Sequence, residues 1–243
     1  MADYDKEAKI YDDVHNSEFM GDTTFYLHEA KKARGKVLEV GCGTGRIYLR
    51  LLEAGVDAYG IDISRGMLQK LRANAHAKGL AEKIFLANAK NFRLPHKFEL
   101  IIVPFRAFLH LLTMDDQLAA LKTMRAHLAP GGKLMLNFFY PDPEFISKNY
   151  HKGKLRKSVV NGIERYDETF FIDEPNQIAQ CKSTFKRKGK KPTKGHFRLA
   201  FIYKREFELL LRLAGFSKWR VYGGFKKEEL KTSKQEMVWV IER

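Results

Sequence analysis

Cysteine is scarce in this chain, which has only Cys42 and Cys181 among its 243 residues. Two thiols are too few for a disulfide framework or a four-thiolate metal site, and neither lies in a Cys-x-x-Cys or Cys-His cluster. We therefore expect two free thiols and no structural metal.

Long apolar runs are also absent. No stretch approaches the roughly 18 uninterrupted apolar residues that a membrane-spanning helix needs. The acidic start, Met1-Ala2-Asp3-Tyr4-Asp5, lacks the charge and apolar order of a signal peptide. With 44% hydrophobic residues the chain can bury a sizeable core. We expect one cytoplasmic domain over residues 1–243, as a monomer or a dimer.

Positive charge is abundant and unevenly placed. The formal net charge is +15, and the segment from Cys181 to Arg198 holds eight Lys or Arg residues and no acid. That segment is either a solvated hairpin that aids solubility or a surface that binds an anionic partner, and composition favours neither interpretation.

The central part of the chain predicts a parallel sheet. From Lys36 to Phe139, short β-branched or apolar runs alternate with amphipathic stretches, as in βαβ units. Ser64 and Thr113 are candidate N-caps, and Pro130-Gly131-Gly132 ends the last helix. The expected strands lie near 36–41, 57–61, 82–86, 98–103 and 132–139, and the expected helices at 45–54, 64–78 and 115–128.

Two further segments flank this unit. Residues 3–30 read as one or two short aromatic-rich helices, and we assign 1–30 to an N-terminal cover over the mouth of the sheet. Residues 155–203 alternate as antiparallel strands do, with turns at 161–162, 174–176 and 189–195. We assign 141–203 to an insertion after the fifth strand, because about 60 residues with few large aliphatics make a poor core alone.

The chain closes with a helix at about 204–214, capped by Gly215, and with two strands near 217–222 and 236–242. An antiparallel pair added to five parallel strands gives seven. The predicted fold is α/β, Rossmann-like, with helices on both faces of a seven-stranded sheet that ends in a reversed hairpin.

The most informative motif is a buried strand that runs through Glu39 into Gly41-Cys42-Gly43-Thr44-Gly45 and then a helix. Glycine permits positive φ angles and lets a ligand approach the backbone and the helix N-terminus. The spacing is G-x-G-x-G, whereas the dinucleotide fingerprint is G-x-G-x-x-G. The loop by itself therefore does not identify its ligand.

A second signal lies 21 residues beyond Gly41, where Asp62 ends the next expected strand. A carboxylate there can accept both hydroxyls of a ribose. The alternative, a helix-capping or surface acid, fits its position after a strand less well.

With these two motifs and two later segments, the sequence resembles the class I S-adenosylmethionine-dependent methyltransferases. The later segments are Leu128-Ala129-Pro130-Gly131-Gly132-Lys133-Leu134 and Leu213-Ala214-Gly215-Phe216. The resemblance implies S-adenosyl-L-methionine as cofactor, with its methionine part over Gly41–Gly45 and its ribose on Asp62. In this family an acid often receives the adenine amino group after strand three, where this chain offers Asn88; its side-chain oxygen can still accept. The remaining contacts that we assign to the cofactor are Tyr11, Glu39, Arg46, Ile63, Met67, Ala89 and Pro104.

Two of these assignments have plain alternatives. Arg46 would hold the methionine carboxylate, or it is a solvated arginine in the first helical turn. Met67 would pack on the adenine face, or it is a core methionine.

The acceptor site of this fold lies beyond strand four, at residues 104–111. This stretch has no Asn- or Asp-Pro-Pro-Tyr tetrapeptide and no Pro-Cys pair, which disfavours direct methylation of nucleic-acid bases. With the early Tyr11-Asp12, it is similar to small-molecule N-methyltransferases of the nucleotide-aminosugar and glycine/sarcosine type. His15 replaces the second tyrosine of their Tyr-Asp-x-x-Tyr segment, which puts the substrate in doubt.

That resemblance implies that His110 acts as a base and that Tyr11 closes over the cofactor. Histidine suits a base because its pKa is ordinarily about 6.5, although His110 would equally suit a hydrogen bond within the core. Arg106 would contact a substrate anion, or pair with a neighbouring helix carboxylate.

Three functions remain open on the sequence. The favoured one is methylation of a small molecule at an amine nitrogen, and anionic small molecules are among the candidates. The second is methylation of RNA or protein docked by a basic surface with Arg165, Tyr166, Lys182 and Arg187. The third is a cofactor-binding protein without catalysis.

Overall fold

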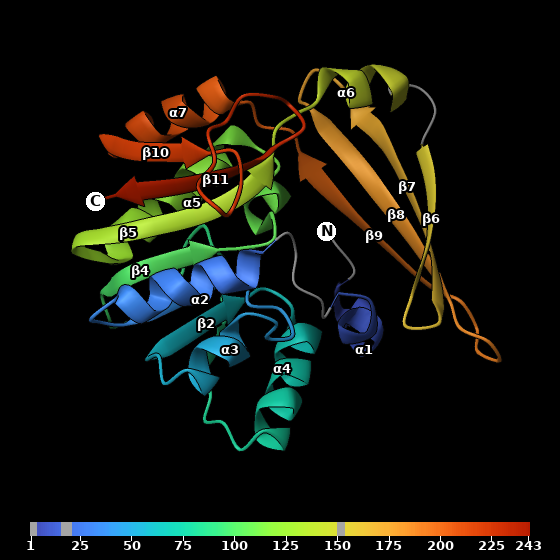
Figure 1. The fold of residues 1–243 in the computed structure, drawn as a ribbon, viewed down its shortest axis with the longest axis horizontal. Helices are drawn as coiled ribbons and strands as arrows, with labels where there is room; N and C mark the ends of the chain where they lie inside the picture. The colour runs from blue at the N-terminus through green and yellow to red at the C-terminus, as the bar shows by residue number, and fades with distance from the viewer. Residues whose placement is uncertain (1–3, 16–20, 150–153) are drawn as a thin grey trace.

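The computed structural model describes residues 4–15, 21–149 and 154–243, which form two sheets (Figure 1). Seven strands make the large sheet, and four make the small sheet. The small sheet is inserted between the fifth strand of the large sheet and the last helix.

The large sheet has the strand order β10-β11-β5-β4-β1-β2-β3. Strands β1 to β5 are parallel, and β11 runs antiparallel to both β5 and β10. The sheet therefore ends in the reversed hairpin that the sequence predicts. Its strands are β1 Val37–Val40, β2 Ala58–Asp62, β3 Ile84–Leu86, β4 Phe98–Val103, β5 Leu128–Phe139, β10 Lys218–Tyr222 and β11 Glu236–Glu242.

Helices cover both faces of the large sheet because its central strands are apolar on both sides. One core lies beneath α2 (Asp22–Lys32), α3 (Tyr48–Glu53) and α4 (Arg65–Ala77). The opposite core lies beneath α5 (Met114–His127) and α7 (Lys204–Leu213). The predicted layers are confirmed.

Local signals set several element boundaries. The Ser64 hydroxyl accepts from the Met67 N–H at 3.1 Å, and the Thr113 hydroxyl accepts from the Asp116 N–H at 3.2 Å, so both predicted N-caps are confirmed. The helix expected from residue 45 begins three residues later, because Gly45 has φ +97°, which no right-handed helix contains.

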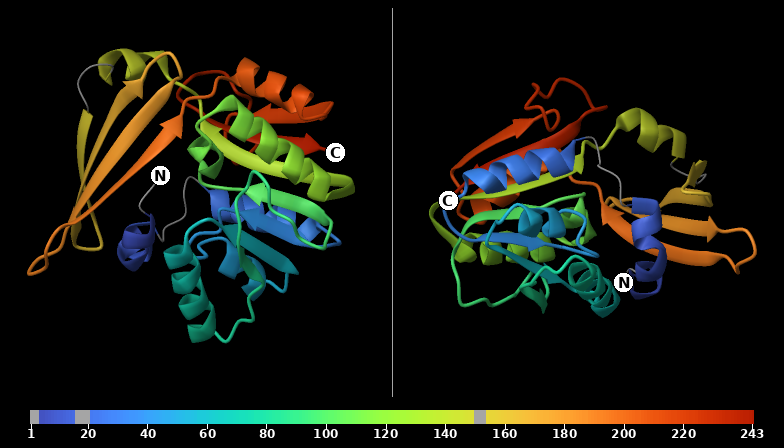
Figure 2. Two further views of the ribbon diagram at one scale, coloured as in Figure 1. Left: turned by 180° about the vertical axis from the view of Figure 1, so that it is seen from behind. Right: turned by 60° about the horizontal axis from the view of Figure 1, so that its bottom comes forward.

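The small sheet has the order β6-β7-β8-β9, with every pair antiparallel. Helix α1 (Tyr4–His15) lies between this sheet and α4 (Figures 1 and 2). Residues 1–3 and 16–20 of the expected N-terminal cover lie outside the described residues. The small-sheet strands are β6 Lys154–Val160, β7 Ile163–Asp173, β8 Ile178–Lys186 and β9 Thr193–Ala200, and two short helices complete the chain, η1 Ala107–His110 and α6 Pro143–Asn149.

Within the described ranges, no helix is long and apolar enough to cross a membrane. The same ranges contain no group of three or more His, Cys, Asp or Glu side chains placed to hold a metal ion. Cys42 and Cys181 are buried free thiols.

Candidate active site

The glycine loop connects β1 to α3, and all three of its glycines have positive φ, at +76° for Gly41, +53° for Gly43 and +97° for Gly45. A Cβ on Gly41 would lie 3.0 Å from Ala107 of η1, so the loop packs directly against the segment that follows β4. A Cβ on Gly43 would meet nothing within 4 Å. The loop therefore presents open space at Gly43 and close packing on either side of it.

Asp62 ends β2 beside this loop. Its carboxylate accepts from the Gly43 N–H and from the Ser64 N–H, both at 2.8 Å. Burial raises its pKa, and these backbone donors act in the opposite direction. Each oxygen keeps a second lone pair, so Asp62 can still accept from a diol.

Glu39 lies at the centre of β1 and is only 3% exposed. Its Oε2 is buried and has no hydrogen-bond partner within the described ranges. Burial raises its pKa well above the usual range, while the Arg46 charge acts against that rise. A buried carboxyl group with an unused oxygen is suited to bind a cationic group of a ligand at the carboxyl end of this strand.

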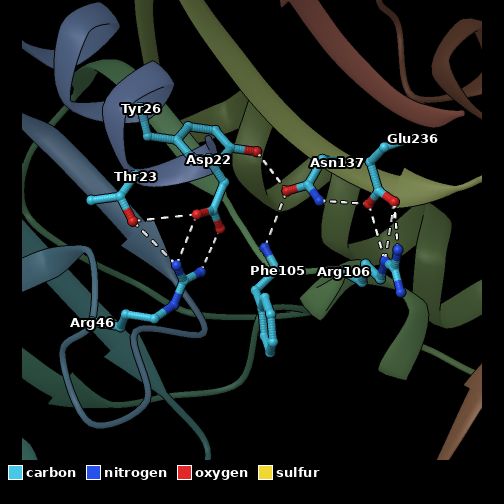
Figure 3. A network of polar contacts seen from close by, with 8 residues as sticks. All are labelled: Asp22, Thr23, Tyr26, Arg46, Phe105, Arg106, Asn137 and Glu236. Carbon is cyan, nitrogen blue, oxygen red and sulfur yellow. Dashed lines mark hydrogen bonds and ion pairs between the residues drawn. The ribbon is translucent and has the colours of Figure 1, made fainter. Parts of the chain in front are cut away.

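Arg46 is bound by α2 (Figure 3). Its guanidinium donates to Asp22 at 2.8 and 2.5 Å and to the Thr23 hydroxyl at 3.2 Å, and Asp22 is fully buried. The same guanidinium lies 4.8 Å from the ring centroid of Phe105. The structure thus gives Arg46 a carboxylate partner inside the chain, and its contact with the cofactor stays a prediction.

Arg106 is held by a second buried acid, Glu236 of β11 (Figure 3). Three hydrogen bonds of 2.6–3.2 Å join the two side chains, and Glu236 is 2% exposed. Asn137 donates to Glu236 at 2.7 Å and accepts from the Phe105 N–H at 3.1 Å. The structure therefore pairs Arg106 with a carboxylate on a strand and not with a neighbouring helix carboxylate, and its contact with a substrate anion stays a prediction.

These bonds stabilise an unusual turn. Phe105 and Arg106 have φ of +53° and +63°, a left-handed conformation that costs non-glycine residues about 1–2 kcal/mol each. Asn137 accepts from the backbone of this turn at Phe105, and Glu236 binds the side chain of Arg106. The turn leads directly into η1 and so fixes where His110 lies.

His110 lies beneath the small sheet and α1. Its Nε2 is 2.9 Å from the Tyr4 hydroxyl, and its ring also bonds the backbone of Arg198 on β9. A carbonyl only accepts, so the ring donates to Arg198, and Nε2 is left to accept from Tyr4. Burial lowers the pKa of His110 to about 4, which keeps it neutral near pH 7.

Aromatic rings surround this pair. Tyr4 stacks on Phe197 of β9 at 6.3 Å between centroids, and its ring edge meets Tyr11 at 6.4 Å. The Tyr11 and His15 rings are 4.6 Å apart. Burial raises the pKa of Tyr4 and of Tyr11, and the negative charge of Asp62 adds to both shifts. Tyr11 and His110 are therefore brought to one region, as the sequence predicts.

The other predicted cofactor residues lie around the ends of β2, β3 and β4. Ile63 is 53% exposed directly after Asp62, which leaves an apolar side chain uncovered at the loop. Met67 is buried in the first turn of α4, and Asn88 accepts from the Lys90 N–H at 3.0 Å through its side-chain oxygen. Ala89 follows Asn88, and Pro104 follows β4. Their contacts with a cofactor stay predictions.

Comparison with known proteins identifies the family. Residues 37–132 match the methyltransferase domain model. An uncharacterized methyltransferase of Geobacillus sp. (strain WCH70) is 32% identical over 206 residues, which cover 84% of this chain and 89% of that protein. A glycine/sarcosine N-methyltransferase of Halorhodospira halochloris is 28% identical, with 93% of this chain and 78% of that protein covered.

A solved structure gives the same fold. The S-adenosylmethionine-bound amino pentose methyltransferase of Micromonospora echinaspora superimposes with a TM-score of 0.70 over 92% of each chain, at 19% identity. The chain belongs to the S-adenosylmethionine-dependent methyltransferases, and its cofactor is S-adenosylmethionine. The open space at Gly43, the diol acceptor Asp62 and the unused oxygen of Glu39 all fit that cofactor.

The sequence did not point to several residues of this region. Four residues contact predicted site residues, and the hydrogen-bonded ones lie 24 to 130 positions away from them: Tyr4, Asp22, Glu236 and Phe197. Asn137 binds the backbone of Phe105, next to Arg106. No local spacing indicates such pairs. The only hint was the density of aromatic residues near Tyr4.

Proposed function

We propose that this methyltransferase acts on the nitrogen of a small-molecule amine bound beneath α1 and the small sheet, beside Tyr4 and His110. The observation that carries the proposal is the hydrogen bond between the Tyr4 hydroxyl and His110 Nε2. It joins a proton donor and a proton acceptor at the end of η1, where the acceptor site of this fold is expected.

For the cofactor, we assign the ribose to Asp62, the methionine ammonium to Glu39 and the methionine carboxylate to Arg46. The adenine would lie between Ile63, Met67 and the Asn88-Ala89 turn, and Tyr11 and Pro104 would close the site. When bound, S-adenosylmethionine supplies a methyl group that reacts with the free lone pair of a nucleophile.

Tyr4 is suited to orient such a nucleophile. Its proton is directed to His110, so the lone pairs of its oxygen are free to accept an N–H from the acceptor amine. That bond would aim the nitrogen's own lone pair away from Tyr4. After methyl transfer the nitrogen is an ammonium ion that keeps its proton, because neither the Tyr4 hydroxyl nor His110, with a pKa of about 4, is basic enough to take it.

His110 then acts through Tyr4. With a pKa of about 4, it is too weak a base to deprotonate a bound ammonium ion, so the acceptor must enter as the neutral amine. The acid side of the pH profile should follow the amine and not His110.

The cover over the site favours a small acceptor. The Asp5 carboxylate of α1 accepts from the Ser64 hydroxyl at 2.6 Å and from the Gly66 N–H at 2.8 Å, which ties α1 to α4. On its other side, α1 is tied to the small sheet, where Asn161 donates to the Asp13 carbonyl at 2.8 Å. A polymer would have to break both attachments to reach Tyr4.

The similarity to a glycine/sarcosine N-methyltransferase supports nitrogen as the methylated atom. Arg106 was predicted to contact a substrate anion. Because Glu236 already pairs with it, we propose that Arg106 mainly positions the η1 turn.

The test is transfer of tritiated methyl groups from S-adenosylmethionine to a metabolite extract and to a panel of small amines and carboxylic acids. With the amine that the wild type uses, Tyr4→Phe should lower kcat about 100-fold, because the acceptor nitrogen loses the hydrogen bond that aims its lone pair at the methyl group. S-adenosylhomocysteine affinity should stay within about twofold, because Tyr4 bonds His110 and not the cofactor cradle.

Tyr140→Phe is the matched control, since Tyr140 packs against Tyr203, away from His110. It should leave kcat unchanged. Transfer only to carboxylic acids would contradict nitrogen methylation. Transfer only to RNA or protein would favour the polymer alternative, and cofactor binding without any transfer would favour a non-catalytic role.

A further inference from the structure

The structure separates the positive charge of the small sheet from the acceptor site. Along β8, the side chains of Cys181, Ser183 and Phe185 are buried, whereas Lys182 and Lys186 are exposed. The buried face is the one that packs toward α1 and η1, since Phe185 joins Val14 of α1 in a small core. The lysines therefore point away from Tyr4 and His110.

Strand β9 repeats this arrangement. Gly195 is buried and Phe197 contacts the His110 ring, whereas Lys194, His196 and Arg198 are exposed. The antiparallel register places Lys182 opposite His196. The cationic side chains of β8 and β9 thus share the outer face of one hairpin.

The tip of the hairpin extends this surface. It adds three exposed lysines and projects beyond the body of the protein in every view (Figures 1 and 2). No acidic residue occurs between Glu174 and Glu206. We call this surface the outer cationic face, which consists of Lys182, Lys186, Lys188, Lys190, Lys191, Lys194 and Arg198.

Two aromatic rings on β7 orient its lysines. The Lys182 ammonium lies 4.8 Å from the ring centroid of Phe170, and the Lys186 ammonium lies 4.8 Å from that of Tyr166. Such contacts contribute little binding energy of their own, but they restrict the long lysine side chains. Less side-chain entropy is therefore lost when the ammonium groups bind a ligand. None of the seven cations makes an ion pair among the described residues.

The inner face, by contrast, is internally neutralised. Arg165 pairs with Asp167 at 2.7 Å, and Ser183 donates to the same carboxylate at 2.7 Å. Arg187 pairs with Asp13 of α1. The four residues that the sequence assigned to one basic surface therefore do not share a face, because strand alternation places Arg165 inside and Tyr166 and Lys182 outside.

We propose that the outer cationic face binds the phosphate backbone of a single-stranded nucleic acid, separately from the acceptor site. Lys182 and Lys186, four residues apart on one strand, are about 14 Å apart at 3.4 Å per residue, and Lys194 and Arg198 repeat this on the next. A linear polyanion can contact such an array along its length, and half-exposed aromatic rings beside it suit unpaired bases.

Charge disfavours two other occupants. A second copy of the chain would bring two cationic faces together. An anionic bilayer would also touch the adjacent strands, where the exposed Leu155 and Val159 lie opposite Glu168 and Glu164. Those acids also lie opposite Lys186 and Lys182, so a flat anionic surface across the sheet would be pressed against them, whereas a single strand can follow β9 and the hairpin tip on the side away from β7.

The test is fluorescence anisotropy of a fluorescein-labelled 20-nucleotide oligouridine RNA at salt concentrations from about 0.05 to 0.3 M. The triple variant Lys182→Gln, Lys186→Gln, Lys194→Gln should bind about 100-fold more weakly than wild type at 0.1 M salt. Its log-log salt slope should be shallower by about 2, because each lost phosphate contact accounts for about 0.7.

A matched triple variant changes the net charge equally at exposed lysines elsewhere, with Lys31→Gln, Lys122→Gln and Lys226→Gln. It should keep its affinity within about threefold. Both triple variants should bind S-adenosylhomocysteine as the wild type does, which checks their folding and separates this proposal from the proposed activity.

Equal weakening in both triple variants would overturn the proposal, because overall charge alone would then explain binding. So would absent RNA binding by the wild type at 0.1 M salt. Binding to phosphatidylserine vesicles without RNA binding, or equal affinity for a 20-base-pair duplex, would overturn the assignment to a single strand.

Discussion

The two glycines at the centre of the cofactor loop should respond to the same substitution in opposite ways. At Gly43 an added Cβ meets nothing within 4 Å, so the unliganded fold has room for alanine. The cost is the left-handed backbone at φ +53°, about 1–2 kcal/mol, which lowers Tm by about 2–8 °C in a domain of this size. The methyl group would instead occupy space that we assign to the cofactor.

Overfilling a packed interface by one methyl group costs about 1–3 kcal/mol. Gly43→Ala should therefore weaken S-adenosylhomocysteine binding about five- to 150-fold in a calorimetric titration. At Gly45, by contrast, the added Cβ would lie 2.9 Å from Leu49 Cγ and 3.0 Å from Leu71 Cγ. Gly45→Ala should destabilise the fold itself by about 3–5 kcal/mol.

Thermal unfolding and calorimetry on both variants separate the two effects. The expected pattern is a Tm lowered by only about 2–8 °C with poor binding for Gly43→Ala, and a more strongly lowered Tm for Gly45→Ala. A well-folded Gly43→Ala protein that binds S-adenosylhomocysteine as tightly as wild type would refute the placement of the cofactor over this loop.

Two further predictions concern buried charge. Glu236→Leu removes the carboxylate that pairs with Arg106, so the free energy of unfolding in urea titrations should fall by about 2–4 kcal/mol. Glu242→Leu, on the same strand but in a more exposed ion pair, should lower it by about 1 kcal/mol or less. Equal losses in the two variants would contradict the stabilising role of the buried pair. His15 and His110 have pKa values lowered to about 4 by burial, so the folded state binds fewer protons than the unfolded state, whose histidines titrate near 6.5. Their stabilisation is complete above about pH 6.5 and is lost as the pH falls toward 4, by up to about 3 kcal/mol each. The double variant with glutamine at both positions should show a flatter loss of stability over that range, and an unchanged pH dependence would contradict the burial of neutral imidazoles.

The order of elements in the large sheet was predictable because each βαβ unit is encoded locally. An apolar run, a cap such as Ser64 and an amphipathic helix follow one another within about 30 residues. The start of β5 was predicted four residues late. Pro130-Gly131-Gly132 does follow the helix, but Leu128 already pairs with Phe98, and the register shift before Leu100 accommodates the irregular residues.

The site was predictable only where a motif is contiguous in sequence. The glycine loop and Asp62 come together because their strands are neighbours, as the βαβ rule requires. The partner of His110 lies 106 residues away, and the partner of Arg106 lies 130 residues away. Such pairs depend on how α1 and β11 dock, which no local pattern encodes.

The direction in which the lysines of the small sheet point could not be predicted without the strand register. Alternation predicts two faces for a strand, but it does not tell which face is covered. The contact of Phe185 with Val14 of α1 decides this, because it places the odd-numbered residues of β8 inside.

The most direct test of the whole account is a crystal structure of the protein with S-adenosylhomocysteine. We expect the ribose hydroxyls on Asp62, the homocysteine chain over Gly43, and the sulfur directed toward the Tyr4-His110 pair beneath the small sheet. A sulfur that faces away from Tyr4 and His110, or a nucleoside bound elsewhere than at Asp62, would contradict it.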